Sequence, residues 1–128
     1  QALEIGKTTI GENHPNYATG LNNLANVLQS KGKYPEAEQL YRQAVETIKT
    51  TLGENHPSYA THLNNLAYLL TKTDEYEEAE SLYRQAIAIS KATIGENHPI
   101  YATRLNNLAE LLETTGRATE AAELLAQL

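Results

Sequence analysis

Apolar residues along the chain recur at spacings of three and four, with polar residues between them. The first such stripe contains Ala18, Leu21, Leu24, Ala25 and Leu28. This spacing is typical of an amphipathic helix with one buried face. It predicts helices over residues 15–31, 34–52, 57–73, 76–94 and 99–115, with partial helices over 1–10 and 118–128. No stretch alternates apolar and polar residues between turn signals, so strands are not expected.

The helical pattern repeats every 42 residues. The string Gly-Glu-Asn-His-Pro begins at Gly11, Gly53 and Gly95, and the string Leu-Asn-Asn-Leu-Ala begins at Leu21, Leu63 and Leu105. Residues 11–52 and 53–94 are identical at 25 of 42 positions. We therefore expect one continuous array. It consists of the end of a preceding repeat in 1–10, repeats over 11–52 and 53–94, and a truncated repeat over 95–128.

Small residues at fixed places distinguish between the repeat classes that share this period. Armadillo and HEAT repeats and propeller blades also run to about 40 residues or more, but a blade needs four strands. From Ala18 to Ala44 the chain fits a tetratricopeptide unit without a gap. Ala25 takes the place where the two helices cross closely, and Ala37 and Ala44 take the small positions of the second helix. Pro15 suits a first helical position and Gly32 a left-handed helix end.

Three strings together carry a closer resemblance: Leu-Asn-Asn-Leu-Ala, Tyr-x-Glu-Ala-Glu-x-Leu-Tyr-Arg-Gln-Ala and Gly-x-x-His-Pro. Their combination resembles the 42-residue tetratricopeptide repeats of kinesin light chains, which many bacterial multidomain proteins also use. The resemblance covers the whole chain. It implies an all-α, right-handed superhelical solenoid of antiparallel helix pairs, with first helices lining a concave groove and second helices forming the convex back. It also implies binding of a peptide or partner protein in the groove, without catalysis and without a cofactor.

Composition excludes several other classes of function. The 128 residues include 10 Lys and Arg against 16 Asp and Glu, a net charge of −6, which argues against nucleic-acid binding. No apolar run approaches the roughly 18 residues of a membrane span. The absence of Cys excludes a thiolate metal site and suits the cytoplasm. Because the chain starts at Gln1 and contains no Met, we expect it to be a piece of a longer protein.

The ionisable residues do not assemble a catalytic or metal site in this pattern. His14, His56 and His98 belong to successive units about 10 Å apart, too far to share one metal ion. A role in turns and helix caps is therefore expected for them. The Glu-rich run from Glu75 to Glu80 is expected to be a solvated helix face, because no base shares that face.

Pairs of Asn in the middle of the first helices are the main functional candidates. Asn competes with the helix backbone for hydrogen bonds, yet the pair occurs three times: Asn22 and Asn23, Asn64 and Asn65, and Asn106 and Asn107. One interpretation is a ladder of hydrogen bonds between repeats. The other is a row of amides for an extended peptide backbone. The expected groove also contains Thr19, Asn26, Thr61, Tyr68, Thr103 and Glu110.

The charges of the expected groove indicate what kind of peptide would fit. Carboxylate-clamping relatives use Lys at the places of Asn22 and Asn64, and those cations are absent. Lys72 and Arg104 are the candidate cations, set against Glu110 and Glu113, so a neutral or partly basic segment is favoured over an acidic one. The first-helix positions that differ between repeats, Gly20/His62/Arg104 and Asn26/Tyr68/Glu110, favour partner recognition.

A purely structural rod with an empty groove is the alternative to a binding module. Incomplete helices at 1–10 and 118–128 would leave apolar faces, formed by Leu3, Ile5 and Ile10 at one end and Leu124, Leu125 and Leu128 at the other. Solenoid repeats need neighbours or polar caps to cover such faces. Head-to-tail self-association is therefore also expected.

Overall fold

The computed structural model describes residues 14–128, which form α-helices joined by short turns. Within this range the helices are α2 Pro15–Ser30, α3 Tyr34–Thr51, α4 Pro57–Lys72, α5 Tyr76–Thr93, α6 Pro99–Thr114 and α7 Ala118–Leu125. The predicted long helices are confirmed, each ending one residue earlier than expected, and α7 ends three residues earlier. The helix expected over 1–10 lies outside the described residues.

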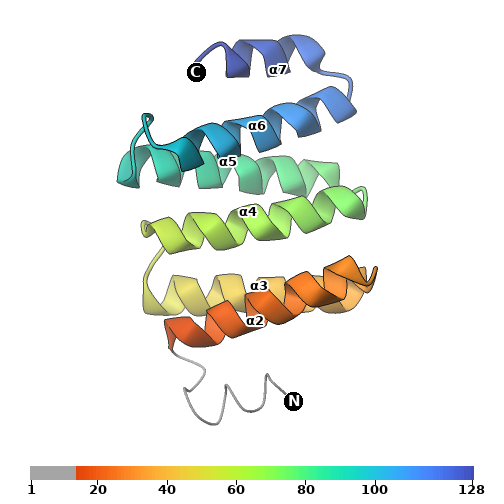
Figure 1. The fold of residues 1–128 in the computed structure, drawn as a ribbon, viewed down its shortest axis with the longest axis vertical. Helices are drawn as coiled ribbons and strands as arrows, with labels where there is room; N and C mark the ends of the chain where they lie inside the picture. The colour runs from red at the N-terminus through yellow and green to blue at the C-terminus, as the bar shows by residue number, and fades with distance from the viewer. Residues whose placement is uncertain (1–13) are drawn as a thin grey trace.

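The helices stack one above another in a solenoid (Figure 1). Each helix packs against the next in sequence, most extensively within the pairs α2 with α3 and α4 with α5. The helix α4 also contacts α6, so the first helices of neighbouring repeats touch. This arrangement places α2, α4 and α6 in one layer and α3 and α5 in the other (Figure 1).

Alanine at the helix crossings allows this close stacking. Ala18, Ala25, Ala37 and Ala44 have no exposed surface, and neither do their counterparts one repeat later. Leucines and tyrosines between them complete a single core that runs from α2 to α7. Because such interiors are close-packed, larger side chains at the crossings would push the helices apart.

Histidine caps the first helix of each described repeat. The Nδ1 atoms of His14, His56 and His98 accept hydrogen bonds from backbone N–H groups two residues later, at 3.0, 3.0 and 3.1 Å. Each imidazole thus satisfies one free N–H at a helix start, as Asp or Ser does more commonly. Pro occupies the first helical position after each histidine. The expected role in caps is confirmed.

The turn inside each helix pair needs a residue with left-handed backbone. Gly32 and Gly116 hold this position at φ of 77° and 83°, and Asp74 holds it in the middle repeat at φ of 63°. Asp tolerates this conformation better than most residues. Its carboxylate also accepts a hydrogen bond from the Tyr76 hydroxyl at 2.8 Å. The predicted left-handed end at Gly32 is confirmed.

None of the helices between residues 14 and 128 has the length and apolar character that a membrane crossing requires.

Candidate functional site

The Asn pairs join the first helices of neighbouring repeats. Asn65 Nδ2 donates to Asn22 Oδ1 at 3.0 Å, and Asn107 Nδ2 donates to Asn64 Oδ1 at 3.2 Å. The ladder interpretation therefore has its contacts. Each bond uses one donor or one acceptor of each amide, whereas an Asn side chain has two donors and an acceptor oxygen with two lone pairs. The remaining capacity of these half-buried amides stays available to a ligand.

The other expected groove residues lie on the same surface of α2, α4 and α6 with differing exposure. Asn22, Asn64, Asn65 and Asn107 are half-buried, and the exposed members are Thr19, Asn23, Asn26, Thr61, Tyr68, Thr103, Asn106 and Glu110. Asn106 Nδ2 donates within its own helix to the carbonyl of Ala102 at 3.0 Å. We call this surface the groove below.

Two cavities open along the groove at equivalent places. The first cavity, of about 360 Å³, lies between α2 and α4, and the second, of about 200 Å³, lies between α4 and α6. Three lining positions keep the same residue type one repeat apart: Tyr34 and Tyr76, Tyr41 and Tyr83, and Asn65 and Asn107. Repetition of the fold therefore produces repetition of the cavity.

Tyr68 separates the two cavities and lines both. Its ring is 41% exposed, which is unusual for a large aromatic side chain in this chain. The Lys72 Nζ atom lies 4.8 Å from the ring centroid, a cation–π contact. Lys72 also lines both cavities, so each of them contains one aromatic edge and one positive charge.

The tyrosines at equivalent depth in the two cavities differ in their hydrogen bonds. The Tyr41 hydroxyl contacts Asn26 Oδ1 and lies 3.0 Å from Gln29 Oε1. The Tyr83 hydroxyl makes no hydrogen bond to the described residues, because Tyr68 and Thr71 stand where Asn26 and Gln29 stand in the first cavity. Burial raises the pKa of both tyrosines, so both remain protonated donors.

His62 and Arg104, expected among the residues that contact a partner, are instead buried between repeats, at 8% and 6% exposure. His62 Nδ1 lies 2.8 Å from the carbonyl of Ser58, one turn earlier in its own helix. Arg104 Nη2 donates to Thr61 Oγ1 at 2.9 Å. The expectation that Arg104 is an open groove cation was wrong. The first helices approach closely at this position, which a single helix pattern does not reveal.

A network of ion pairs on the second helices was missed by sequence reasoning. The guanidinium of Arg42 binds both carboxylate oxygens of Glu78 in the next repeat, at 2.9 and 3.0 Å, and also binds Glu38. This contact holds the pKa of Glu78 below its ordinary value. The expected Glu38–Arg42 pair is confirmed, but Glu78 was assigned to a solvated face. The signal available was the 36-residue spacing of opposite charges.

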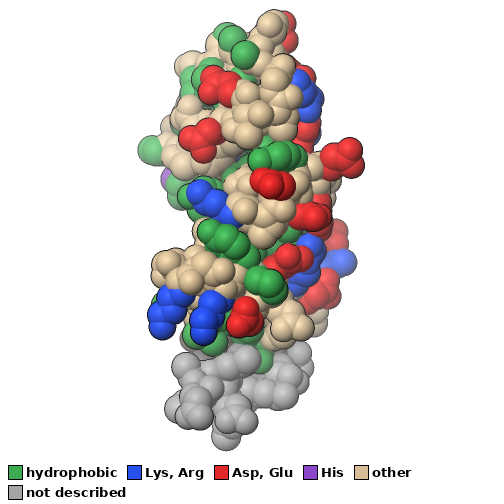
Figure 2. Space-filling model, turned by 90° about the vertical axis from the view of Figure 1, so that its right-hand side faces the viewer, with side chains coloured by type: hydrophobic (Ala, Val, Ile, Leu, Met, Phe, Trp, Pro, Cys, Tyr) green, Lys and Arg blue, Asp and Glu red, His purple; other side chains and the backbone are tan. Residues whose placement is uncertain are grey.

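The ion pairs continue behind the second cavity. Arg84 binds Glu80 and Glu120 at 3.0 Å each, and Arg117 binds Glu80 at 2.6 Å and Glu120 at 2.8 Å. Acidic and basic side chains lie side by side along the right-hand edge of the molecule in Figure 2. The second helices are thus joined by charge, and the first helices by amides.

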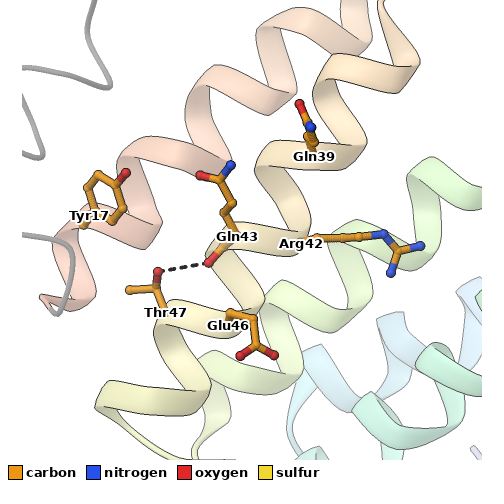
Figure 3. A pocket seen from close by; sticks show the side chains of 6 residues that line it. All are labelled: Tyr17, Gln39, Arg42, Gln43, Glu46 and Thr47. Carbon is orange, nitrogen blue, oxygen red and sulfur yellow. Dashed lines mark hydrogen bonds between the residues drawn. The ribbon is translucent and has the colours of Figure 1, made fainter.

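The largest cavity, of about 480 Å³, lies outside the groove and is lined by Tyr17, Gln39, Arg42, Gln43, Glu46 and Thr47. Thr47 Oγ1 donates to the carbonyl of Gln43 at 2.9 Å (Figure 3). The Arg42 side chain points away from this cavity, toward the next repeat (Figure 3). None of the expected groove residues lines it.

Comparisons with known proteins agree with this architecture. The sequence matches the tetratricopeptide repeat family over residues 1–50, 18–92 and 58–128. No curated protein matches the chain. A crystal structure of the nearly identical TPR-like repeats of a kinesin light chain-like protein from Podosopora anserina is 30% identical, with a TM-score of 0.87. The structure of BtubC (BKLC) from P. vanneervenii is 24% identical, with a TM-score of 0.89, and shows the fold alone.

Both alignments cover 98% of this chain, but only 59% of the first structure and 50% of the second. The chain therefore spans little more than half the length of the solved structures it matches. The family match extends over the whole chain and agrees with the helix pairs, the Asn pairs and the alanine crossings. The chain belongs to the tetratricopeptide repeat family and is an array of the kinesin light chain type.

Proposed function

We propose that the groove of α2, α4 and α6 binds an extended peptide segment of a partner protein. Tetratricopeptide repeats generally bind protein partners, and their fold is a non-catalytic scaffold, so we assign no enzymatic role. The observation that carries the proposal is the pair of equivalent cavities on either side of Tyr68. Two similar cavities one repeat apart suit alternate side chains of one extended chain.

The half-buried amides supply polar contacts that an extended backbone needs. Asn65 and Asn107 each keep the carbonyl oxygen of their side chain free of hydrogen bonds within the described residues, and Asn64 keeps its Nδ2 group free. A peptide backbone has one donor and one acceptor per residue and pairs readily with such groups. Amides would therefore hold the backbone, while the cavities would select side chains.

The charges near the cavities favour a neutral or partly basic segment. Lys72 is the exposed cation that lines both cavities, and its charge already faces the Tyr68 ring. Glu110 lines the second cavity, and the net charge of the chain is −6. Long-range attraction would therefore bring a basic segment to the groove faster than an acidic one.

Selection of peptides followed by substitution in the groove tests the proposal. Random linear peptides displayed on phage are selected on the 128-residue chain, and the recovered peptides are titrated calorimetrically. Asn65→Ala is expected to weaken their binding by about 1 kcal/mol or more, because a buried polar contact is lost. Gln39→Ala, in the cavity outside the groove, is the matched control and is expected to leave binding unchanged.

A structural array with an empty groove is the second candidate, favoured by the Asn bonds and the ion pairs between repeats. If Asn65→Ala lowers the free energy of unfolding strongly but leaves peptide binding intact, the Asn pairs are structural. If no peptide is recovered and sedimentation shows size rising with concentration, the self-associating rod replaces the binding module.

A further inference from the structure

Arg104 is a buried guanidinium without an anionic partner in the described part of the chain. Its side chain is 6% exposed, and none of the ion pairs between residues 14 and 128 includes it. Its single hydrogen bond goes from Nη2 to the hydroxyl of Thr61. The Nε atom is fully buried and has no partner. Four of the five N–H donors of the guanidinium are therefore unused.

Such burial is costly unless something compensates the charge. Removal of a cation from water costs several kcal/mol without a counterion. Desolvation lowers the pKa of Arg104, but guanidinium groups in proteins remain protonated at neutral pH. Buried polar groups are otherwise satisfied almost throughout the described chain, so this exception points to a missing partner.

The fold itself does not require an arginine at this position. Equivalent residues one and two repeats earlier are His62 and Gly20. Gly20 has no side chain to bury, and His62 meets its need for a hydrogen bond at the Ser58 carbonyl of its own helix. The helices pack in the same way in both repeats. Arg104 therefore adds a charge where the fold accepts a neutral ring or a hydrogen atom.

The guanidinium lies beside the groove. Its partner Thr61 is exposed, and Asn107 one turn later on α6 binds Asn64 one turn later on α4. Thr61 uses its hydroxyl hydrogen on the carbonyl of Pro57 at 3.3 Å, so its oxygen accepts from Arg104. An anion that entered between Thr61 and Asn107 would meet the open side of the guanidinium.

We propose that Arg104 binds the carboxylate of one Asp or Glu side chain of the partner peptide. This inference rests on the proposed function, since the carboxylate arrives with the peptide in the groove. The carboxylate would supply the missing counterion through charge-assisted hydrogen bonds. A second acidic residue beyond it would approach Glu110 and is disfavoured. The partner segment thus carries one acid within an otherwise neutral or basic sequence.

A double-mutant cycle on selected peptides tests this assignment. The random segment is displayed at the N-terminus of a phage coat protein, so that it has no free C-terminal carboxylate. Peptides recovered on the unmodified chain are expected to share one Asp or Glu. Its replacement by Gln or Asn is expected to weaken binding about tenfold to a hundredfold to the unmodified chain, and not to Arg104→His. Arg104→His uses the residue that the fold already holds at position 62.

Controls separate this result from general effects of charge and stability. Lys91→Gln removes an exposed cation outside the groove and is expected to keep the acid dependence. Arg104→Lys is expected to keep part of it, and circular dichroism checks that each variant is folded. Recovered peptides without a shared acid would overturn the Arg104 assignment and leave the proposed function standing. Recovery of no peptide would overturn both.

A third outcome concerns the source of the carboxylate. If the recovered peptides show no shared acid, synthetic versions with a free or an amidated C-terminus are compared on both chains. Tighter binding of the free form that depends on Arg104 would assign the site to a chain end, and the side-chain proposal would be wrong.

Discussion

The first and second cavities occupy the same place in successive repeats, yet their deepest tyrosines end in different surroundings. The Tyr41 hydroxyl is bound by Asn26 and Gln29, whereas the Tyr83 hydroxyl has no partner in the described residues. The first cavity is therefore closed chemically at its base, and the second cavity offers a free donor. The second cavity also has Glu110 where the first has Tyr68.

The comparison separates what the repeat requires from what a ligand would recognise. Positions that hold the helices together keep their residue type, as Tyr34 and Tyr76 or Asn65 and Asn107 do. Positions on the first helices that face the cavities change, as Asn26 changes to Tyr68. Each cavity therefore has the same shape with a different lining. Specificity in such an array comes from a few exchanged side chains on a constant frame.

The largest expected effect comes from giving the second cavity the lining of the first. The double variant Tyr68→Asn and Thr71→Gln removes the shared aromatic wall and offers acceptors to the Tyr83 hydroxyl. We expect peptide affinity to fall by about 2 kcal/mol, because tyrosine walls are frequent binding hot spots. Calorimetric titration with a selected peptide measures the loss. Thr71→Gln alone, which keeps Tyr68, is the control and should retain most of the affinity.

The two tyrosines should respond differently to loss of the hydroxyl. Tyr41→Phe removes an internal hydrogen bond and is expected to lower the free energy of unfolding by about 1 kcal/mol. Tyr83→Phe removes a hydroxyl without an internal partner and is expected to change stability by less than about 0.5 kcal/mol while weakening peptide binding. Urea denaturation compares the two. Equal losses of stability would show that the Tyr83 hydroxyl is also satisfied inside the protein.

Local features of the chain were predictable from the sequence, and contacts between repeats were not. Pro after each His and Gly32 after the first stripe fixed the helix bounds closely, because caps act within a few residues. The Arg42–Glu78 pair depends on how one repeat is rotated on the next. Burial of Arg104 depends on the approach of α6 to α4. The pattern of one helix specifies neither quantity, so these residues were assigned to solvent or to the open groove.

His62 makes the interface beside the first cavity sensitive to pH. Its Nδ1 must carry hydrogen, because the Ser58 carbonyl can only accept. Burial lowers the pKa of His62 below its ordinary value of 6.5, so the unfolded chain binds a proton first as the pH falls. The free energy of unfolding should therefore decrease as the pH falls through 6.5 and level off below the folded pKa. The difference between the unmodified chain and His62→Gln, measured by urea denaturation across this range, isolates the effect.

The smallest expected effect concerns the ion pairs behind the cavities. One bidentate pair, Arg42–Glu78, joins the second helices behind the first cavity, whereas Arg84 and Arg117 share two carboxylates behind the second. Because the side chains of Arg42 and Glu78 are 42% and 44% exposed, solvent screens their attraction. Glu78→Gln should therefore lower the free energy of unfolding by only about 0.5 kcal/mol.

Glu77→Gln, at the exposed neighbour of Glu78, is the matched control and should be neutral within about 0.3 kcal/mol. Glu120→Gln should cost more than Glu78→Gln, since Glu120 is bound by both Arg84 and Arg117. Salt should reduce both differences in urea denaturation, because the Debye length shortens to about 3 Å at 1 M. If Glu78→Gln and Glu77→Gln behave alike at low salt, the repeats are held by their apolar and amide contacts. The constant frame of the two cavities would then owe nothing measurable to the charged back.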